Sequence, residues 1–200
     1  MHRVMTLREM AGVIAGETRF SESAVVTIDA QEEYRSGRLS LHKITEAIQE
    51  GAAVLDKARM HHTPIFHVVQ TNPPQAKMFA QGSVLSQVFH EYAISKDEVI
   101  VPKTLPNSFT KTTLYESLIR TGRRNLIVFG FMTHMCVSTT IRAALDHGFS
   151  VTVVADACAT RDLPSIDGTI ISAQDVHRVA LAELADRFAW VVKDQTCCFS

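Results

Sequence analysis

The chain has 200 residues, of which 46% are hydrophobic and 20% are charged, and its formal net charge at pH 7 is −1. This size and composition predict one globular domain over residues 1–200, with an N-terminal arm or surface helix over residues 1–20. The balanced charge, with both signs interspersed, gives no sign of the clustered basic surface that nucleic acids and anionic membranes require, so we expect a small-molecule partner.

Six short apolar runs, rich in β-branched residues, recur along the chain at intervals that suit crossover helices. Several of them lack alternation of apolar and polar residues, which is typical of parallel strands covered by helices on both faces. They are Ala24 to Ile28, Pro64 to Val69, Glu98 to Val101, Leu126 to Phe129, Val151 to Ala155, and Phe188 to Val192. This pattern predicts a doubly wound α/β sheet with right-handed crossovers.

Helical apolar stripes lie between these strands, over residues 44–58, 113–122, 137–148 and 172–184. Thr113 with Glu116 predicts a capping box at the start of the second helix. Gly148 predicts the end of the third helix, and Ser172 with Asp175 predicts the start of the fourth. The segment from Gln70 to Ser95 is irregular, and it either walls a pocket or forms an insertion that packs on its own side of the core.

Three chemically distinctive residues follow predicted strands, at the edge of an open α/β sheet where ligands bind. They are Asp29, Lys103 and Cys136. Cys136 also lies at the start of a helix, where free backbone N–H groups and the helix dipole favour a thiolate and can receive an oxyanion. A buried cysteine, a turn-capping aspartate and a solvated lysine are the ordinary alternatives, but all three residues point to one sheet edge.

This trio predicts nucleophilic catalysis without a histidine. An ordinary thiol, with a pKa of about 8.5, is only a few per cent thiolate at neutral pH, so it requires a base or a cation beside it. Asp29 can take the thiol proton and return it to a leaving amine, and we expect Lys103 to lower the pKa of the thiol. A lowering by about two units represents roughly 2.7 kcal/mol.

The ordered motifs resemble those of the isochorismatase-like cysteine hydrolases over about Ala24 to Val192. The motifs are Ile28-Asp-Ala-Gln31, Val101-Pro-Lys103, Asn107-Ser-Phe109, Gly130-Phe-Met-Thr133-His-Met-Cys136-Val, and Val153-Val-Ala-Asp-Ala-Cys158. The resemblance implies a Rossmann-like, three-layer α/β/α sandwich around a six-stranded parallel sheet. It also implies an acyl-enzyme route with a triad in which Asp29 is the acid and base, Lys103 the electrostatic partner and Cys136 the nucleophile.

The resemblance further implies a cis peptide at Phe131-Met132 and an oxyanion hole formed by the backbone N–H groups of Met132 and Cys136. We expect Thr133 to hydrogen-bond this turn. The predicted substrate-binding residues are Gln31, Tyr34, Phe109, Phe131, Met132 and Thr133. A surface loop explains Gln31 and Tyr34 equally well, and core packing explains Phe109, Phe131 and Met132 equally well.

Two departures narrow the predicted chemistry. Nicotinamidases of this family carry a metal-binding Asp-x-His after the second strand, where this chain reads Val69-Gln-Thr-Asn-Pro73. True isochorismatases cleave a vinyl ether without depending on a cysteine, so Cys136 favours hydrolysis of a C–N bond in a small amide or carbamoyl substrate. The alternatives are a vinyl-ether hydrolase that uses Asp29 and a non-catalytic binding protein that retains the fold.

The remaining expectations concern cofactors, location and assembly. The four cysteines have neither metal-ligand spacing nor the pattern of a disulfide framework, and the histidines lack metal spacing, so we predict no metal and no cofactor. Charged residues interrupt the first 20 positions, leaving neither a signal-peptide core nor a membrane span, so we predict a cytoplasmic protein. Family members commonly assemble, which implies a homo-oligomer.

Overall fold

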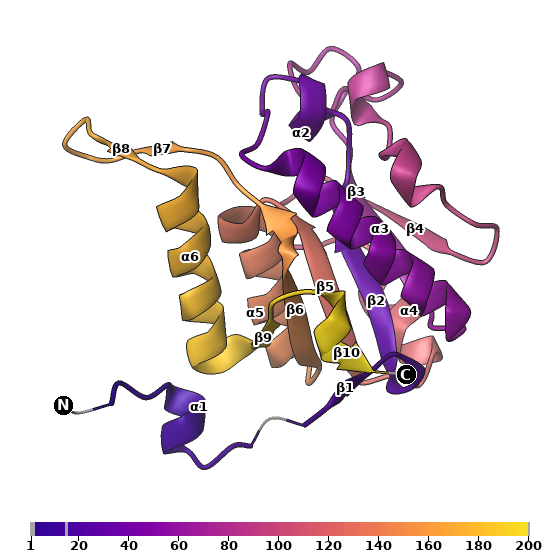
Figure 1. Cartoon of the computed structure of the whole chain (residues 1–200). Helices are drawn as coiled ribbons and strands as arrows, with labels where there is room; N and C mark the ends of the chain where they lie inside the picture. Colours follow the sequence, from indigo (N-terminus) through magenta and orange to yellow (C-terminus); the bar gives the residue numbers. More distant parts are fainter. Residues whose placement is uncertain (1–2, 15, 200) are drawn as a thin grey trace.

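The computed structural model describes residues 3–14 and 16–199, and its centre is a six-stranded parallel sheet (Figure 1). The strand order is β4-β3-β2-β5-β6-β9, and every neighbouring pair is parallel. The strands are β2 (Ser23–Ile28), β3 (Ile65–Gln70), β4 (Val99–Lys103), β5 (Asn125–Phe131), β6 (Ser150–Ala159) and β9 (Trp190–Val192). All six predicted strands are therefore present.

Helices cover both faces of this sheet. The crossovers from β2 to β3 to β4 run one way across the sheet, and those from β4 to β5 to β6 to β9 run the other way. Right-handed crossovers therefore place α3 (Ile44–Met60) on one face, and α4 (Leu114–Arg120), α5 (Ser138–Asp146) and α6 (Ala173–Glu183) on the other. In Figure 1, α3 crosses in front of the sheet and α5 lies behind it, which gives the predicted three-layer sandwich.

The helix ends agree with the sequence in two cases and differ in one. The Ser172 hydroxyl accepts a hydrogen bond from the Asp175 N–H at 3.1 Å, and Gly148 follows α5 with a φ of 79°. The predicted capping box at Thr113 is wrong, because this residue has φ −93° and ψ 8° and makes no side-chain cap. A capping side chain requires an extended N-cap backbone, and Thr112 Oγ1 accepts from the Leu114 N–H instead.

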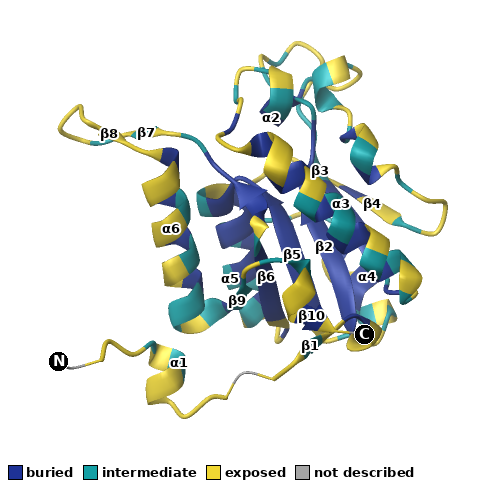
Figure 2. Ribbon diagram, in the orientation of Figure 1, coloured by how far each residue is buried: buried dark blue, intermediate teal, exposed yellow. Residues whose placement is uncertain are grey.

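The core lies along the central strands, and β2 is buried at every position (Figure 2). Within the irregular segment the structure has two short 3-10 turns, η2 (Val84–Ser86) and η3 (His90–Tyr92). The Phe89 and Tyr92 rings of this segment lie 5.9 Å and 6.0 Å from Phe131 and Phe129 of β5, measured between centroids. This part of the segment therefore packs on the sheet core.

Short elements complete the described residues. Near the N-terminus are α1 (Leu7–Met10) and β1 (Thr18–Arg19), and β1 pairs with β10 (Cys198–Phe199). The antiparallel strands β7 (Leu163–Pro164) and β8 (Ile170–Ile171) form a hairpin that projects from the body (Figure 1). The others are η1 (Phe20–Glu22), α2 (Glu33–Ser36), η4 (Thr133–Val137), η5 (Leu184–Phe188) and η6 (Gln195–Cys197). Among the described residues, the structure has no helix with the length and apolar character needed to cross a bilayer.

Candidate active site

The carboxyl ends of three strands bring Asp29, Lys103 and Cys136 into one cluster. Asp29 directly follows β2, Lys103 ends β4, and Cys136 lies in η4 just after β5. Lys103 Nζ is 2.8 Å from Asp29 Oδ2 and donates a hydrogen bond to Cys136 Sγ at 3.5 Å. Since β3 separates β2 from β4, the long lysine side chain spans the end of a strand to reach both partners.

The cluster is shielded from solvent, and this sets its protonation. Asp29, Lys103 and Cys136 are 0%, 2% and 7% exposed. Burial raises the pKa of Asp29, and the Lys103 charge opposes this shift. Burial also raises the pKa of the Cys136 thiol to about 12, the Asp29 charge raises it further, and Lys103 acts in the opposite direction. Lys103 therefore acts on the thiol pKa in the expected direction, but the expected net lowering is wrong, because desolvation and the carboxylate outweigh the ammonium.

A fourth side chain at this edge, Gln70, escaped the sequence analysis. Gln70 ends β3, and its Oε1 accepts a hydrogen bond from Lys103 Nζ at 2.8 Å. The Gln31 side chain holds the Gln70 backbone, because Gln31 Oε1 accepts from the Gln70 N–H at 2.8 Å and Gln31 Nε2 donates to the Gln70 carbonyl at 3.0 Å. The sequence feature that could have identified Gln70 is its position as a polar residue at the end of β3, the strand between β2 and β4.

The turn that carries the nucleophile contains the cis peptide Phe131-Met132, at the position that the resemblance implies. The preceding Gly130 has a φ of 127°, and a Cβ there would lie 2.1 Å from the Ile28 carbonyl oxygen, so only glycine permits this approach of β5 to β2. Thr133 Oγ1 donates to the Ala159 carbonyl at 3.1 Å and lies 2.9 Å from His177 Nδ1. Thr133 therefore ties the turn to β6 and α6, a different role from the expected bond within the turn.

The predicted substrate-binding residues fall into two groups. Phe131 and Met132 belong to the nucleophile turn, and the Tyr34 ring centroid lies 5.7 Å from that of Phe131. Burial raises the pKa of the Tyr34 hydroxyl, and the charges of Asp29 and Cys136 add to this shift.

Gln31 also lies beside the triad, but its side-chain amide is engaged by the backbone of Gln70 and by the Ser86 carbonyl. Phe109 lies elsewhere. Its ring centroid is 4.8 Å from that of His147 and 6.0 Å from that of Phe149, beyond the far end of α5 and at the amino edge of the sheet. The chain leaves the catalytic edge after Lys103 and has reached the opposite edge of the sheet at Phe109, so Phe109 does not lie at the site.

A model of the isochorismatase domain matches residues 23–196. The chain belongs to the isochorismatase family. It is 37% identical to the secreted isochorismatase effector Isc1 of Verticillium dahliae, over 95% of this chain and 97% of that protein. It is 27% identical to nicotinamidase 3 of Arabidopsis thaliana, over 85% of this chain and 84% of the relative. The crystal structure of an isochorismatase from Pseudomonas putida KT2440 superimposes with a TM-score of 0.91 and 37% identity, covering 96% of this chain and 97% of the other.

As an isochorismatase-family protein, the chain is a hydrolase. The three residues that its sequence singles out at the carboxyl edge are the same three that the structure gathers into one buried cluster. Within the part of the chain that the structure describes, there is no group of three or more His, Cys, Asp or Glu side chains that could hold a metal ion.

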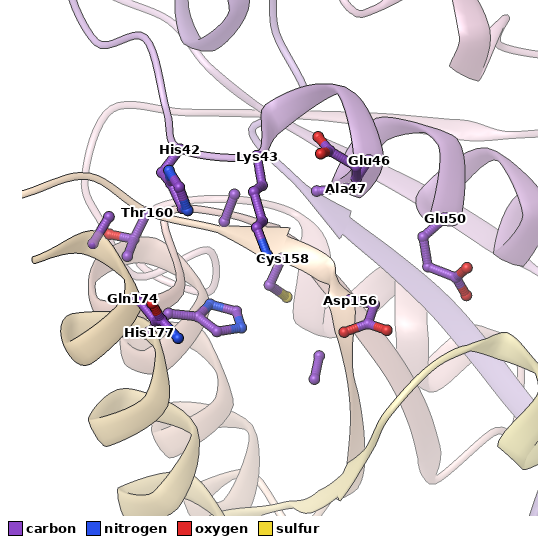
Figure 3. A pocket seen from close by; sticks show the side chains of 13 residues that line it. His42, Lys43, Glu46, Ala47, Glu50, Asp156, Cys158, Thr160, Gln174 and His177 are labelled. Carbon is purple, nitrogen blue, oxygen red and sulfur yellow. The ribbon is translucent and has the colours of Figure 1, made fainter.

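This isochorismatase-family chain also has a pocket of about 430 Å³ between α3, β6 and α6 (Figure 3). Lys43, which directly precedes α3, points into it together with Asp156 of β6 and His177 of α6. Two of its lining residues contact the nucleophile turn, because His177 pairs with Thr133 and Thr160 Oγ1 lies 2.6 Å from His134 Nδ1. The triad residues do not line this pocket, which therefore lies beside the catalytic cluster.

Proposed function

We propose that this protein is a cysteine-dependent hydrolase that cleaves a C–N bond of a small amide, carbamoyl or related substrate through a thioester. The observation that carries the proposal is the buried contact of one ammonium with both a carboxylate and a thiol. Lys103 Nζ lies 2.8 Å from Asp29 and 3.5 Å from Cys136, at the sheet edge where ligands bind in this class of fold.

In the first half of the reaction, Cys136 Sγ attacks the substrate carbonyl and the thiol proton passes to Asp29. Because the raised pKa keeps the thiol protonated at neutral pH, this proton leaves as the C–S bond forms. The raised pKa of Asp29 makes its carboxylate a stronger proton acceptor than an exposed aspartate. The Lys103 ammonium stabilises the negative charge on sulfur, and the backbone N–H groups of Met132 and Cys136 receive the oxyanion.

In the second half, Asp29 returns its proton to the leaving nitrogen, and the C–N bond breaks to give the thioester and an amine or ammonia. Asp29 then takes a proton from water as the water oxygen attacks the thioester carbonyl, and it returns that proton to the Cys136 sulfur as the C–S bond breaks, which releases the acid and restores the thiol. One carboxylate therefore acts as base and then as acid in each half of the reaction.

Two features support an amide-type substrate without a metal. One relative is named for nicotinamide hydrolysis, which breaks a C–N bond. Gln70 and Asn72 occupy the place of the metal-binding Asp-x-His, and their side chains hydrogen-bond to each other at 2.9 Å.

Intact-mass trapping tests this proposal. The protein is mixed with a panel of small amides and ureas, quenched in acid and weighed, with Cys136→Ala as the blank. We expect an acyl adduct on Cys136 and no turnover of the same substrate by the variant. Turnover by Cys136→Ala at the rate of the unchanged protein would contradict the thioester route.

The Verticillium relative favours a second candidate, hydrolysis of a vinyl ether by proton transfer from Asp29. Cys136 would then be a bystander. Isochorismate is the discriminating substrate, since the second candidate predicts full activity on it after Cys136→Ala and loss of activity after Asp29→Asn.

A further inference from the structure

The Lys103 ammonium has three N–H groups, and three partners surround it. It donates hydrogen bonds to Gln70 Oε1 at 2.8 Å and Cys136 Sγ at 3.5 Å, and it forms an ion pair with Asp29 Oδ2 at 2.8 Å. The Lys103 side chain is fully buried, so water cannot replace a missing acceptor. Because the three N–H groups of Lys103 are fixed relative to one another, the partners of two of them set the direction of the third.

The carboxamide of Gln70 is itself fixed in orientation. Its Nε2 donates to Asn72 Oδ1 at 2.9 Å, and Asn72 Nδ2 donates to the Met78 carbonyl at 3.0 Å. This chain of donors leaves Gln70 Oε1, rather than its nitrogen, facing Lys103. The two hydrogen bonds from the Gln31 side chain fix the backbone of Gln70, and they do not involve the side-chain carboxamide of Gln70.

Without this third acceptor, Asp29 would dominate the position of the ammonium. A contact between an ammonium and a carboxylate is much stronger than an N–H to sulfur contact, and in a buried site the difference grows because the surroundings are weakly polar. Gln70 contacts the ammonium from the end of β3, whereas Asp29 contacts it from the end of β2. Gln70 does so with a neutral group, so it adds no negative charge beside the sulfur.

We propose that Gln70 is a positioning residue, whose side-chain oxygen holds the Lys103 ammonium so that one N–H remains directed at Cys136 Sγ. The inference rests on the proposed function and names a residue that acts through Lys103 without touching substrate. Charge neutrality is part of the role. A glutamate at position 70 would add a second carboxylate next to one ammonium and would oppose formation of the thiolate.

The test follows the rate at which iodoacetamide labels Cys136, measured by peptide mass spectrometry from pH 7 to pH 10. Below its pKa, the thiolate fraction falls tenfold for each unit by which that pKa rises. For Gln70→Met, which keeps the side-chain length without the acceptor, we expect labelling about tenfold slower at every pH in this range. For Gln70→Glu we expect a larger decrease, and for the shorter Gln70→Asn a decrease similar to that of Gln70→Met.

Gln49→Met is the matched control, because Gln49 lies exposed on α3, and we expect it to label at the original rate. Labelling of the buried Cys158 reports the fold, and it stays slow in every variant that remains folded. The positioning role would be overturned if Gln70→Met and Gln70→Asn label at the rate of the unsubstituted protein, or if Gln70→Glu labels faster than that protein. If one variant does not fold, the other two still decide the question.

This experiment uses no substrate, so its outcome is separate from that of adduct trapping. An acyl adduct on Cys136 together with unchanged labelling of the Gln70 variants would remove only the role of Gln70. Slower labelling of these variants, with unchanged turnover by Cys136→Ala, would remove only the thioester route.

Discussion

At the scale of single residues, the buried pair of Asp29 and Lys103 governs the chemistry of the site. Each charge is shielded from water and stabilises the other. The Asp29 carboxylate raises the pKa of Cys136, whereas the Lys103 ammonium lowers it. Asp29 also adopts a φ of 51°, in the left-handed region that Asp and Asn tolerate better than most residues. Asparagine is therefore the substitution that removes the charge with least disturbance of the backbone.

Changing either member of this pair leaves the other charge buried and unpaired. We expect Asp29→Asn or Lys103→Met to lower the free energy of unfolding by about 3 to 5 kcal/mol. The double variant removes both charges and recovers most of this loss, although its turnover stays at least about 10²-fold below the original. Urea unfolding and turnover assays measure the two effects. A double variant whose loss equals the sum of the two single losses would show that the residues do not interact.

The residue scale is also where sequence reasoning was least complete. The types and order of Asp29, Lys103 and Cys136 could be read from the chain, because ligand sites follow strand ends in this class of fold. The pKa of the thiol could not, since it depends on how completely folding excludes water from Sγ. Gln70 was overlooked because nothing in the sequence states which way the last side chain of a strand points.

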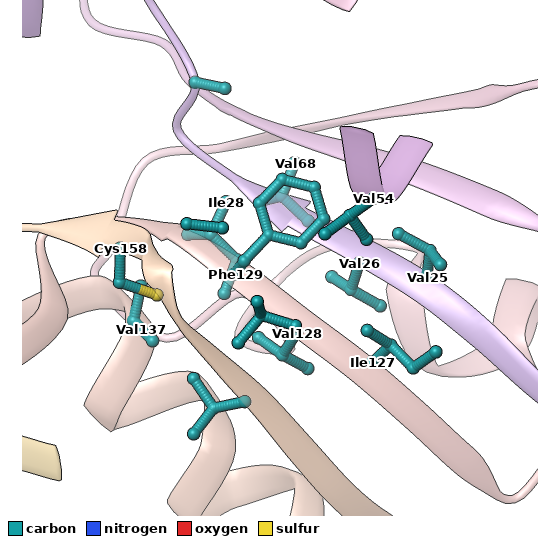
Figure 4. Close-up of a cluster of buried hydrophobic side chains, with 14 of the residues drawn as sticks. Val25, Val26, Ile28, Val54, Val68, Ile127, Val128, Phe129, Val137 and Cys158 are labelled. Carbon is teal, nitrogen blue, oxygen red and sulfur yellow. The ribbon is translucent and has the colours of Figure 1, made fainter. Parts of the chain in front are cut away.

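At the scale of elements, the contact between β2 and β5 positions the catalytic turn. Figure 4 shows apolar side chains of both strands packed side by side, including Val26 and Ile28 of β2 and Ile127 and Val128 of β5. The two strands pair in register from Ser23 with Asn125 to Ile28 with Gly130. The same pairing that buries these side chains therefore delivers Asp29 and the nucleophile turn to adjacent positions.

Gly130 is the most constrained point of this contact. We expect Gly130→Ala to lower the free energy of unfolding by about 3 kcal/mol or more, since it adds strain at a positive φ to a clash with the Ile28 carbonyl. Gly82→Ala is the matched control, because Gly82 has a φ of 82° with open space around it, and its cost is about 1 to 2 kcal/mol. Equal losses in urea unfolding would show that the close approach of β5 to β2 carries no energetic weight.

Element positions were predicted well and some element ends were not. Continuous apolar runs such as Leu126 to Phe129 report local burial, so the strands could be read directly. The capping box at Thr113 failed because a cap depends on backbone angles that the neighbouring residues share in setting. Phe109 was misplaced because sequence distance from Lys103 does not state which sheet edge a loop reaches.

At the scale of the whole molecule, buried thiols make the free energy of unfolding depend on pH in the alkaline range. Burial raises the pKa of Cys136 and Cys158 to about 12 and that of Cys198 to about 11. These groups ionise more readily in the unfolded chain, near pH 8.5 to 9, so the unfolded state binds fewer protons above that pH. Their contribution to stability is complete below pH about 9 and is lost as the pH rises towards 12.

We therefore expect the free energy of unfolding in urea to decline from pH about 9 upward, with a smaller decline after Cys158→Ala. Cys197→Ala serves as the comparison, because Cys197 is exposed. An identical alkaline decline in the Cys158→Ala and unchanged proteins would contradict a contribution from this thiol.

Association of copies and a cytoplasmic location stay predictions, and the name of the Verticillium relative describes a secreted protein. The β7–β8 hairpin offers a place to test association, because Ile166, Ile170 and Ile171 are exposed on it. Large exposed apolar side chains in one projecting hairpin are typical of interaction surfaces. If copies associate there, Ile166→Glu with Ile170→Glu lowers the mass measured by light scattering, whereas Val84→Glu leaves it unchanged. An unaltered oligomeric mass would exclude this hairpin.

The pairing of β1 with β10 brings residues 18–19 and 198–199 together at the amino edge of the sheet, where Thr18 Oγ1 lies 2.7 Å from Thr152 Oγ1 (Figure 1). A reporter fused behind Phe199 would thus sit across the protein from the reacting sulfur. A circular permutant could therefore be made by removing the first seventeen residues, joining the two ends with a short peptide linker and placing the new termini in a surface loop.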